Sequence, residues 1–468
     1  MNALPQRAAP SARIPVLVGW AIVVLVGVLL IVGSQSLRFF DTYDFKRVAG
    51  HLLLTPLGDG IRWALPDGPF GPPQNPELAT FLFSFLGWVQ RYLPGAVFDI
   101  SRTALLAKCL LAACALVLAR QCAAALNRGA WWCMGLALAW LGVFFMAHNI
   151  GMAQSLYAEY VFLFGLPLVL VGLLARSRRA RLACLVIGTL VCGLAKVQYF
   201  YVPALVLACV WGAGRWQRMV PDKQLLRRLL LVQVLCLVPL LMGKHAALNA
   251  YHGVYLGSYM VLSPAQLDVI GVPADLRSCI GVDAWGHELS GPGGTQVRHV
   301  DRLCRPKILK LSKRDVVWPY LRFPETFLHL LQYALPYHFT VHYFHVYPDR
   351  LYLERLDGGT QPVTSLLVRM TELRERLVTP LAPLFLLGSL VFFALSRRAG
   401  DGLRRLALAG LVLGLFMVTQ VVIALLGEGV RDLSKHLWGA QLGLDMLVVL
   451  TALQCLGWLW RRRGEPAA

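Results

Sequence analysis

The chain has 468 residues, of which 57% are apolar and only 15% are charged. Several charge-free apolar runs approach or exceed the ~20 residues that a helix needs to cross a bilayer. This composition excludes a soluble enzyme and predicts an all-α polytopic membrane protein. The formal net charge of +20 would indicate a nucleic-acid partner in a soluble chain, so the positions of the charges decide what it means.

The first predicted span covers residues 14–37, which are 24 consecutive residues without a charged side chain. The run is too long for the core of a signal peptide, and Arg38, Phe39 and Phe40 follow it where a cleavage site would need small residues. We therefore expect it to remain as a transmembrane helix. The other predicted spans are 103–119, 130–148, 157–175, 182–197, 201–214, 229–243, 377–396, 406–427 and 437–460.

The charges between these spans indicate the topology. With the N-terminus in the cytoplasm, the inner segments contain 20 Lys and Arg residues and three acidic ones, a net +17 of the +20. An excess of Lys and Arg marks cytoplasmic loops, so we expect no nucleic-acid partner. The same rule makes 182–214 a hairpin, because a single helix would put the five basic residues from Arg215 to Arg228 outside. The prediction is ten spans in a bacterial inner membrane, with both termini cytoplasmic.

Three parts follow along the chain. Residues 1–243 form an N-terminal transmembrane module with a first outer loop at 38–102, residues 244–376 a large outer (periplasmic) loop, and residues 377–468 the C-terminal transmembrane helices. Both outer loops contain aromatic, amphipathic segments suited to the membrane surface. Of eleven cysteines, the only two away from the spans are Cys279 and Cys304, a natural disulfide in an oxidising compartment. Two unpaired thiols are the alternative.

The first candidate for chemistry is "DTYD", directly after the first span. Asp41 and Asp44 are three residues apart and would share one face of a helix. A carboxylate held near Lys46 or Arg47 stays ionised and could take a proton from an acceptor hydroxyl. Alternatively, these charges only mark the point where the helix leaves the lipid.

Three further polar segments lie at the expected outer ends of spans. "AHNIGMAQSLYAEY" brings Glu159 next to hydrocarbon, where a polar group is costly unless the protein satisfies it, although an ordinary tight turn is the alternative. "AKVQYFYVP" contains Lys196 and Gln198, and the cation could hold the phosphate of a lipid carrier or simply snorkel to water.

The last of these segments is "GEGVRDLSKHLWGAQ", with Arg431, Lys435 and His436. Arg431 and Lys435 are four residues apart, so a helical turn would present two cations on one face, suited to an anionic phosphate. The excess of Lys and Arg in cytoplasmic loops does not account for basic residues on this outer side. A separate group, His338, His342 and His345, has a spacing that could suit a metal, but we interpret it as an interfacial aromatic helix and expect no metal site and no other cofactor.

An outer carboxylate after a long first helix, amphipathic segments behind it, many further spans and a large late outer loop together resemble the type C integral-membrane glycosyltransferases. The resemblance implies a polyprenyl-phosphate sugar as donor and an Asp or Glu of the first outer loop as catalytic base, here Asp44 or Asp41. That family often has an adjacent acidic pair, whereas Thr42 and Tyr43 separate the two carboxylates here.

Two of the polar segments add to this resemblance. Residues 427–441 are similar to the Arg-containing outer segment before the last helices of enzymes that use lipid-linked sugars. Residues 147–160 are similar to a Tyr- and Ser-rich turn with an acidic residue in the same family. The second likeness implies that one cavity is lined by Glu159, Tyr157, His148, Asn149 and Gln154.

We therefore expect a glycosyltransferase that moves a sugar from a polyprenyl-phosphate carrier to a glycan or lipid acceptor at the outer face of the membrane. A surface-polysaccharide polymerase would share the cavity and the cations. A transporter or flippase for a lipid-linked substrate, also in contact with membrane lipid, would instead place charged residues near mid-membrane and have little mass outside it.

Overall fold

Long apolar helices form the body of the protein, as the charge-free runs predict. The computed structural model describes residues 10–39, 48–57, 61–72, 77–217, 222–242, 246–284, 304, 311, 313–338, 342–343, 352–356, 360–431 and 433–462. The helices of the bundle are α1 (Pro10–Gly33), α4 (Ile100–Ala125), α5 (Ala130–Phe144), α6 (Ala147–Ala153), α7 (Phe162–Leu174), α8 (Arg178–Ala195), α9 (Val202–Trp216), α10 (Lys223–Met242), α16 (Pro362–Leu377), α17 (Ala382–Leu395), α18 (Asp401–Glu428) and α20 (Trp438–Arg462).

Six stretches of the described residues are long and apolar enough to cross a membrane, judged by length and composition. A seventh is added if α5 and α6, which are bent by 66° relative to each other, count as one broken span. The six are Ile14–Gly33, Ile100–Ala125, Val197–Trp216, Pro362–Arg398, Asp401–Glu428 and Trp438–Arg461. Helices α7, α8 and α10 occupy the positions of three other expected spans, so the number ten stays a prediction.

Close packing in the bundle depends on small residues. Helix α7 lies along α8, and α18 lies along α20. A Cβ atom added to Gly188 of α8 would come within 2.7 Å of the backbone nitrogen of Val169 in α7. Helices that approach this closely gain van der Waals contact, which is the main attraction between helices in lipid.

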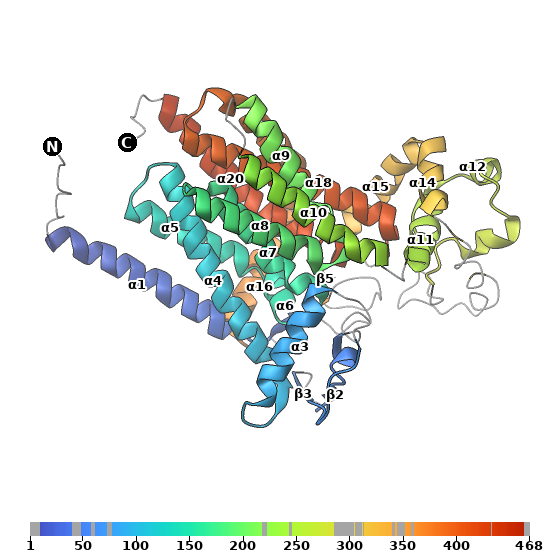
Figure 1. Ribbon diagram of the computed structural model, residues 1–468, viewed down its shortest axis with the longest axis horizontal. Helices are drawn as coiled ribbons and strands as arrows, with labels where there is room; N and C mark the ends of the chain where they lie inside the picture. The colour runs from blue at the N-terminus through green and yellow to red at the C-terminus, as the bar shows by residue number, and fades with distance from the viewer. Residues whose placement is uncertain are drawn as a thin grey trace.

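The basic segments expected on the inner side lie together at one end of the bundle. Arg461 donates a hydrogen bond of 2.7 Å to the carbonyl of Arg398. Arg405 donates one of 3.2 Å to the carbonyl of Leu174. The start of α1 and the end of α20 are drawn toward the left of Figure 1, whereas α11 (Ala246–Tyr255), α12 (Pro264–Val269) and α14 (Lys313–Arg322) are at the opposite side.

One exposed ion pair also belongs to this basic end. Arg178, in the first turn of α8, binds Asp222 at 2.7 Å. Hydrogen bonds from Arg178 lower the pKa of Asp222 to about 2, so the pair is charged at any pH suitable for handling membranes. It connects the start of α8 to the residue before α10.

The two predicted outer loops meet in a small sheet. Strand β1 (Leu37–Phe39) follows α1 and pairs antiparallel with β6 (Tyr352–Arg355), which precedes α16 and also lies parallel to β5 (His342–Tyr343). A second sheet has the order β2 (Thr55–Pro56), β3 (Arg62–Ala64) and β4 (Val97–Asp99). The remaining elements are α3 (Leu78–Arg91), α15 (Glu325–His338), α19 (Leu433–His436), and the short turns η1 (Ala158–Tyr160), η2 (Val197–Tyr199), η3 (Ser258–Val261), η4 (Ala274–Cys279), η6 (Thr379–Leu381) and η7 (Ser396–Arg398).

Helices of the outer loops pack on the end of the bundle away from the basic segments. Helix α11 lies against α18, α15 touches α19, and α3 touches η1 and α8. Helix α18 alone, with 28 residues, spans about 42 Å. A membrane-length helix therefore separates the basic segments from the outer-loop helices, as the predicted topology requires.

This arrangement leads to a labelling prediction. Single cysteines at Ala265 and Arg179, both exposed, should react differently with a membrane-impermeant maleimide added to spheroplasts. We expect labelling at Ala265→Cys only, because positive-inside orientation puts residue 179 in the cytoplasm. Permeabilised membranes should label both, and the parental protein gives the background. Equal labelling of both sites in sealed spheroplasts would contradict the topology.

Candidate functional site

Three short polar segments that are far apart in the sequence converge at the end of the bundle opposite the basic segments. The first contact joins Glu159 of η1 to Lys196 at the tip of the α8–α9 hairpin, with 2.8 Å between Oε1 and Nζ. Their side chains are 1% and 11% exposed. At this degree of burial, removing either charge would leave the other buried without a counter-charge, which would destabilise the protein.

The second contact joins the hairpin tip to the segment between α18 and α20. His436 places Nε2 2.9 Å from Oε2 of Glu428, and its Nδ1 faces Oε1 of Gln198. A cationic imidazole would donate to both oxygens, and a neutral one fits if the Gln198 amide is turned over. Lys196 and Lys435 both interact electrostatically with Glu428. We call these six residues the charged cluster: Glu159, Lys196, Gln198, Glu428, Lys435 and His436.

Hydrogen bonds and ring stacking hold the charged cluster against the helices of the bundle. Gln420 donates its amide N–H to the carbonyl of His436 at 2.8 Å and accepts a hydrogen bond of 2.8 Å from the hydroxyl of Tyr201. The ring of Tyr199 stacks on Phe162, with 4.1 Å between centroids. Aromatic packing and buried hydrogen bonds therefore fix the hairpin tip against α7 and α18.

A glycine sets the path of the chain after α18. Gly429 has a φ of +60°, and a Cβ atom there would come within 2.2 Å of the carbonyl oxygen of Leu256. The next residue, Val430, donates its N–H to that carbonyl at 2.8 Å. Only glycine combines this conformation with such a close approach, so the sequence "GEGV" ends α18 and directs the chain toward α11.

This turn separates two cations that the sequence analysis placed on one helical face. The helix in this segment, α19, begins at Leu433 and includes Lys435, whereas Arg431 lies in the turn before it. Arg431 instead binds Asp283 of the large outer loop, with 2.8 Å between Nη1 and Oδ2. The expected one-face arrangement is therefore wrong, although both cations remain at the same end of the bundle.

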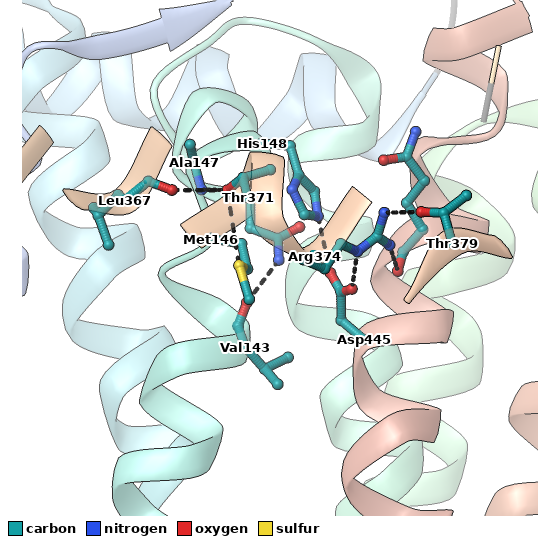
Figure 2. Close-up of polar contacts among 11 residues, drawn as sticks. Val143, Met146, Ala147, His148, Leu367, Thr371, Arg374, Thr379 and Asp445 are labelled. Atoms are coloured by element: carbon teal, nitrogen blue, oxygen red, sulfur yellow. Dashed lines mark hydrogen bonds and ion pairs between the residues drawn. The ribbon is translucent and has the colours of Figure 1, made fainter. Parts of the chain in front are cut away.

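A second group of charges, the buried triad of His148, Arg374 and Asp445, lies further inside the protein (Figure 2). His148 of α6 and Arg374 of α16 converge on Asp445 of α20, at 3.0 and 2.5 Å. Arg374 also donates to the carbonyl of Gln441 at 3.1 Å and to the hydroxyl of Thr379 at 3.2 Å. The three side chains are 4% exposed or less. The triad therefore ties three elements together.

The same region holds the bent helix pair in place. Asn149 donates to the carbonyl of Val143 at 2.9 Å, across the break between α5 and α6. Thr371 of α16 accepts the N–H of Ala147 at 2.9 Å (Figure 2). His148 and Asn149 were expected to line the candidate cavity beside Glu159. Within the part of the chain that the structure describes, His148 bonds to Asp445 and Asn149 to Val143 instead.

Gln154, expected to line the same cavity, instead contacts a buried cation, Lys108. Lys108 donates to the carbonyl of Ser34 at 3.1 Å and to Gln154 at 3.0 Å. The Ser34 carbonyl follows the end of α1, where helix carbonyls lack partners, so Lys108 caps that helix. Gln154 thus holds the side chain that caps α1, and its expected place in a cavity lining is not observed among these contacts. Tyr157 is fully buried and packs edge-on against Phe39, with 6.5 Å between centroids.

The remaining candidates divide into described and undescribed residues. Cys279 and Cys304 form a disulfide with 5.9 Å between their Cα atoms. Asp41, Asp44 and His345 lie outside the described residues. Within the described ranges, no group of three or more His, Cys, Asp or Glu side chains is placed to hold a metal ion.

Four charged residues of these sites were not among the sequence candidates. Glu428 stood in a segment that the analysis singled out, and its position at the end of a span could have marked it. Asp445 is the only acidic residue of the expected span 437–460, and an isolated charge inside a span is a functional candidate by default. Asp283 and Arg374 gave no such signal, because they lie among other charges of a polar loop.

Comparison with known proteins adds a relative without an assigned function. The chain is 24% identical over 314 residues to YfdI, an uncharacterized protein of Escherichia coli K12. This alignment covers 65% of the present chain and 65% of the length of YfdI. No protein-family profile matches the chain, and no solved structure matches it. Only the site itself therefore indicates a function.

The buried triad leads to a stability prediction. Asp445→Asn keeps the shape of the side chain but leaves Arg374 buried without a carboxylate, which should cost about 3–5 kcal/mol. Thermal unfolding of the detergent-solubilised protein should show a clearly lower midpoint. The matched control is Asp401→Asn, which removes the carboxylate of another Arg pair whose Asp side chain is 62% exposed. That change should cost no more than about 1 kcal/mol, and equal midpoints for the two variants would contradict the role of the triad.

Proposed function

We propose that this protein is a membrane glycosyltransferase that transfers a sugar from a polyprenyl-phosphate carrier to an acceptor at the outer face of the membrane. The observation that carries the proposal is the convergence of the hairpin tip, η1 and the α18–α20 connection in one charged cluster. All three segments come from expected outer ends of spans. A cluster at this level would meet both the headgroup of a lipid carrier and a water-soluble acceptor.

The cations of this end would bind the carrier phosphate. Lys435, Arg431 and Lys196 are only 5%, 8% and 11% exposed, so water screens them weakly. Glu159 fixes Lys196 and Asp283 fixes Arg431, so the cations are held in position before the donor arrives. A preorganised site of this kind spends little energy on reorganisation when an anion binds or when charge develops on the leaving phosphate.

The chemistry assigned to this site is a displacement at the anomeric carbon of the donor sugar. The acceptor hydroxyl gives its proton to a carboxylate, and its oxygen forms the new glycosidic bond. The bond between the anomeric carbon and the phosphate oxygen breaks, and the polyprenyl phosphate leaves with the bonding electrons. We assign the base to Asp44 or Asp41, with Glu159 as the third candidate, and the family likeness implies inversion at the anomeric carbon.

One described contact supports the choice of these two carboxylates. Phe39, the last described residue before them, packs its ring on Tyr157, and Tyr157 precedes Glu159 by two residues. The chain therefore enters the "DTYD" segment beside the turn that supplies Glu159.

The rival functions differ in what they require. A surface-polysaccharide polymerase would use the same cations and differs only in its acceptor, a growing glycan. A flippase would need charges that change partners inside the membrane, and the buried triad is the feature that favours it. In that triad, however, Asp445 already binds both His148 and Arg374. These bonds within the protein favour a structural role for it.

A test of the base uses transfer from a synthetic polyprenyl-phosphate sugar in membranes. Asp44→Asn should remove a proton acceptor with almost no change of shape, so transfer should fall by about 10²–10⁴-fold while donor retention is unchanged. Asp41→Asn is tested in parallel, because either residue is a candidate. Parental rates in both variants would exclude the two carboxylates as the base.

A test of the phosphate site uses retention of a polyprenyl phosphate without sugar. Replacing Lys196 alone would strand Glu159, so the informative variant is the double change Lys196→Gln with Glu159→Gln, which removes both charges. We expect it to fold and to bind the probe more weakly by about 2 kcal/mol or more, which is the loss of a charge-assisted bond. Lys223→Gln, an exposed cation at the basic end, is the control and should bind normally. Unchanged binding by the double variant would remove Lys196 from the proposed site.

A further inference from the structure

One carboxylate of the large outer loop, that of Asp283, reaches the charged end of the bundle. Asp283 is fully buried and pairs with Arg431 at 2.8 Å. It lies four residues after Cys279, whose disulfide to Cys304 is buried in a small core with Tyr251, Val254 and Val282. A buried carboxylate must stay in contact with its cation, because an unpaired buried charge is costly. The position of residues 279–284 therefore determines where Arg431 is held.

The backbone of this segment is fastened to α11 and to the residues around it. The N–H of Gly281 donates to the carbonyl of Tyr255 at 3.0 Å. The hydroxyl of Tyr251 donates to the carbonyl of Val282 at 3.2 Å, and the N–H of Ala284 donates to Nε2 of His252 at 3.2 Å. These three bonds surround Asp283 and leave it little freedom to move along α11.

The end of α11 also holds the other partner of the pair. Leu256 accepts the N–H of Val430, the residue directly before Arg431. The loop segment and the α18–α20 connection are thus fixed to consecutive residues, Tyr255 and Leu256. The ion pair between Asp283 and Arg431 closes this three-part arrangement.

From this geometry we propose that Asp283 is the positioning residue for Arg431, and that the Cys279–Cys304 disulfide sets the position of Asp283 and so the affinity for the donor phosphate. This inference rests on the proposed function, in which Arg431 binds that phosphate. In the reduction, the Cys279–Cys304 disulfide gains two electrons and becomes two cysteine thiols. Two thiol groups of the reductant lose these electrons and form one disulfide. The outer loop would then lose its covalent tie, and redox conditions outside the membrane would control donor binding.

The experiment uses the full-length protein in detergent and two readouts. One readout is binding of a polyprenyl phosphate without sugar, and the other is hydrogen exchange of the backbone at residues 427–437. Reduction with dithiothreitol should weaken binding by about tenfold, within the usual range for coupling between two sites. It should also speed exchange at residues 427–437. Asp283→Asn should have both effects without reduction, and Asp283→Glu should restore both in part.

Matched variants separate positioning from general loosening of the loop. Asp268→Asn removes another carboxylate of the same loop, which pairs with Arg277 and is 67% exposed, and it should leave both readouts unchanged. In the double variant Cys279→Ser with Cys304→Ser, dithiothreitol should have no further effect. If the double variant does not fold, reduction of the folded parental protein still gives the answer.

The outcomes distinguish this inference from the proposed function. If neither reduction nor Asp283→Asn changes the rate of hydrogen exchange at residues 427–437, the positioning role of Asp283 is overturned. Faster exchange together with weaker probe binding would support it. If exchange responds but the oxidised parental protein never binds the polyprenyl phosphate, then Asp283 does position Arg431, and the phosphate site of the proposed function is wrong.

Discussion

A charge that leaves water must find an opposite charge or several hydrogen bonds, and this requirement organises the described part of the protein. Glu159 meets Lys196, Asp283 meets Arg431, and Asp445 meets both His148 and Arg374. In each case the partners come from different elements. The pairs therefore determine which segments of the bundle and the outer loops lie together, while apolar packing in lipid is far less specific.

Both groups of charges contain buried polar atoms without a hydrogen-bond partner among the described residues. In the buried triad, both oxygens of Asp445 are bonded and Arg374 has three partners, but Nδ1 of His148 has none. In the charged cluster, Oε2 of Glu159 and the amide nitrogen of Gln198 are buried without a hydrogen-bond partner among the described residues. A bound ligand would satisfy such groups, whereas an empty site leaves them at a cost. The cluster, and not the triad, is assigned a substrate because its three segments come from the expected outer ends of spans.

The sequence was informative where a polar residue stood beside hydrocarbon. Lys196, Gln198 and His436 were found in this way, because nothing in membrane topology requires them. The partners of these side chains could not be predicted from a single sequence. Glu159 and Lys196, for example, belong to different turns, and only the packing of α7 on α8 brings them together. Arg431 and Lys435 show the limit of spacing arguments, because the positive φ of Gly429 starts a turn before α19. His148 was misassigned for a related reason, as the bend between α5 and α6 directs it to Asp445.

The cations of the proposed site each have a carboxylate nearby. Lys196, Lys435 and Arg431 are matched by three carboxylates, those of Glu159, Glu428 and Asp283. A phosphate would then be held mainly by donors fixed in advance, and less by a net positive field. The ring of His436 lies between Glu428 and Gln198 and joins the α18–α20 connection to the hairpin tip, so the donors that would hold the phosphate are fixed to one another as well as to the bundle.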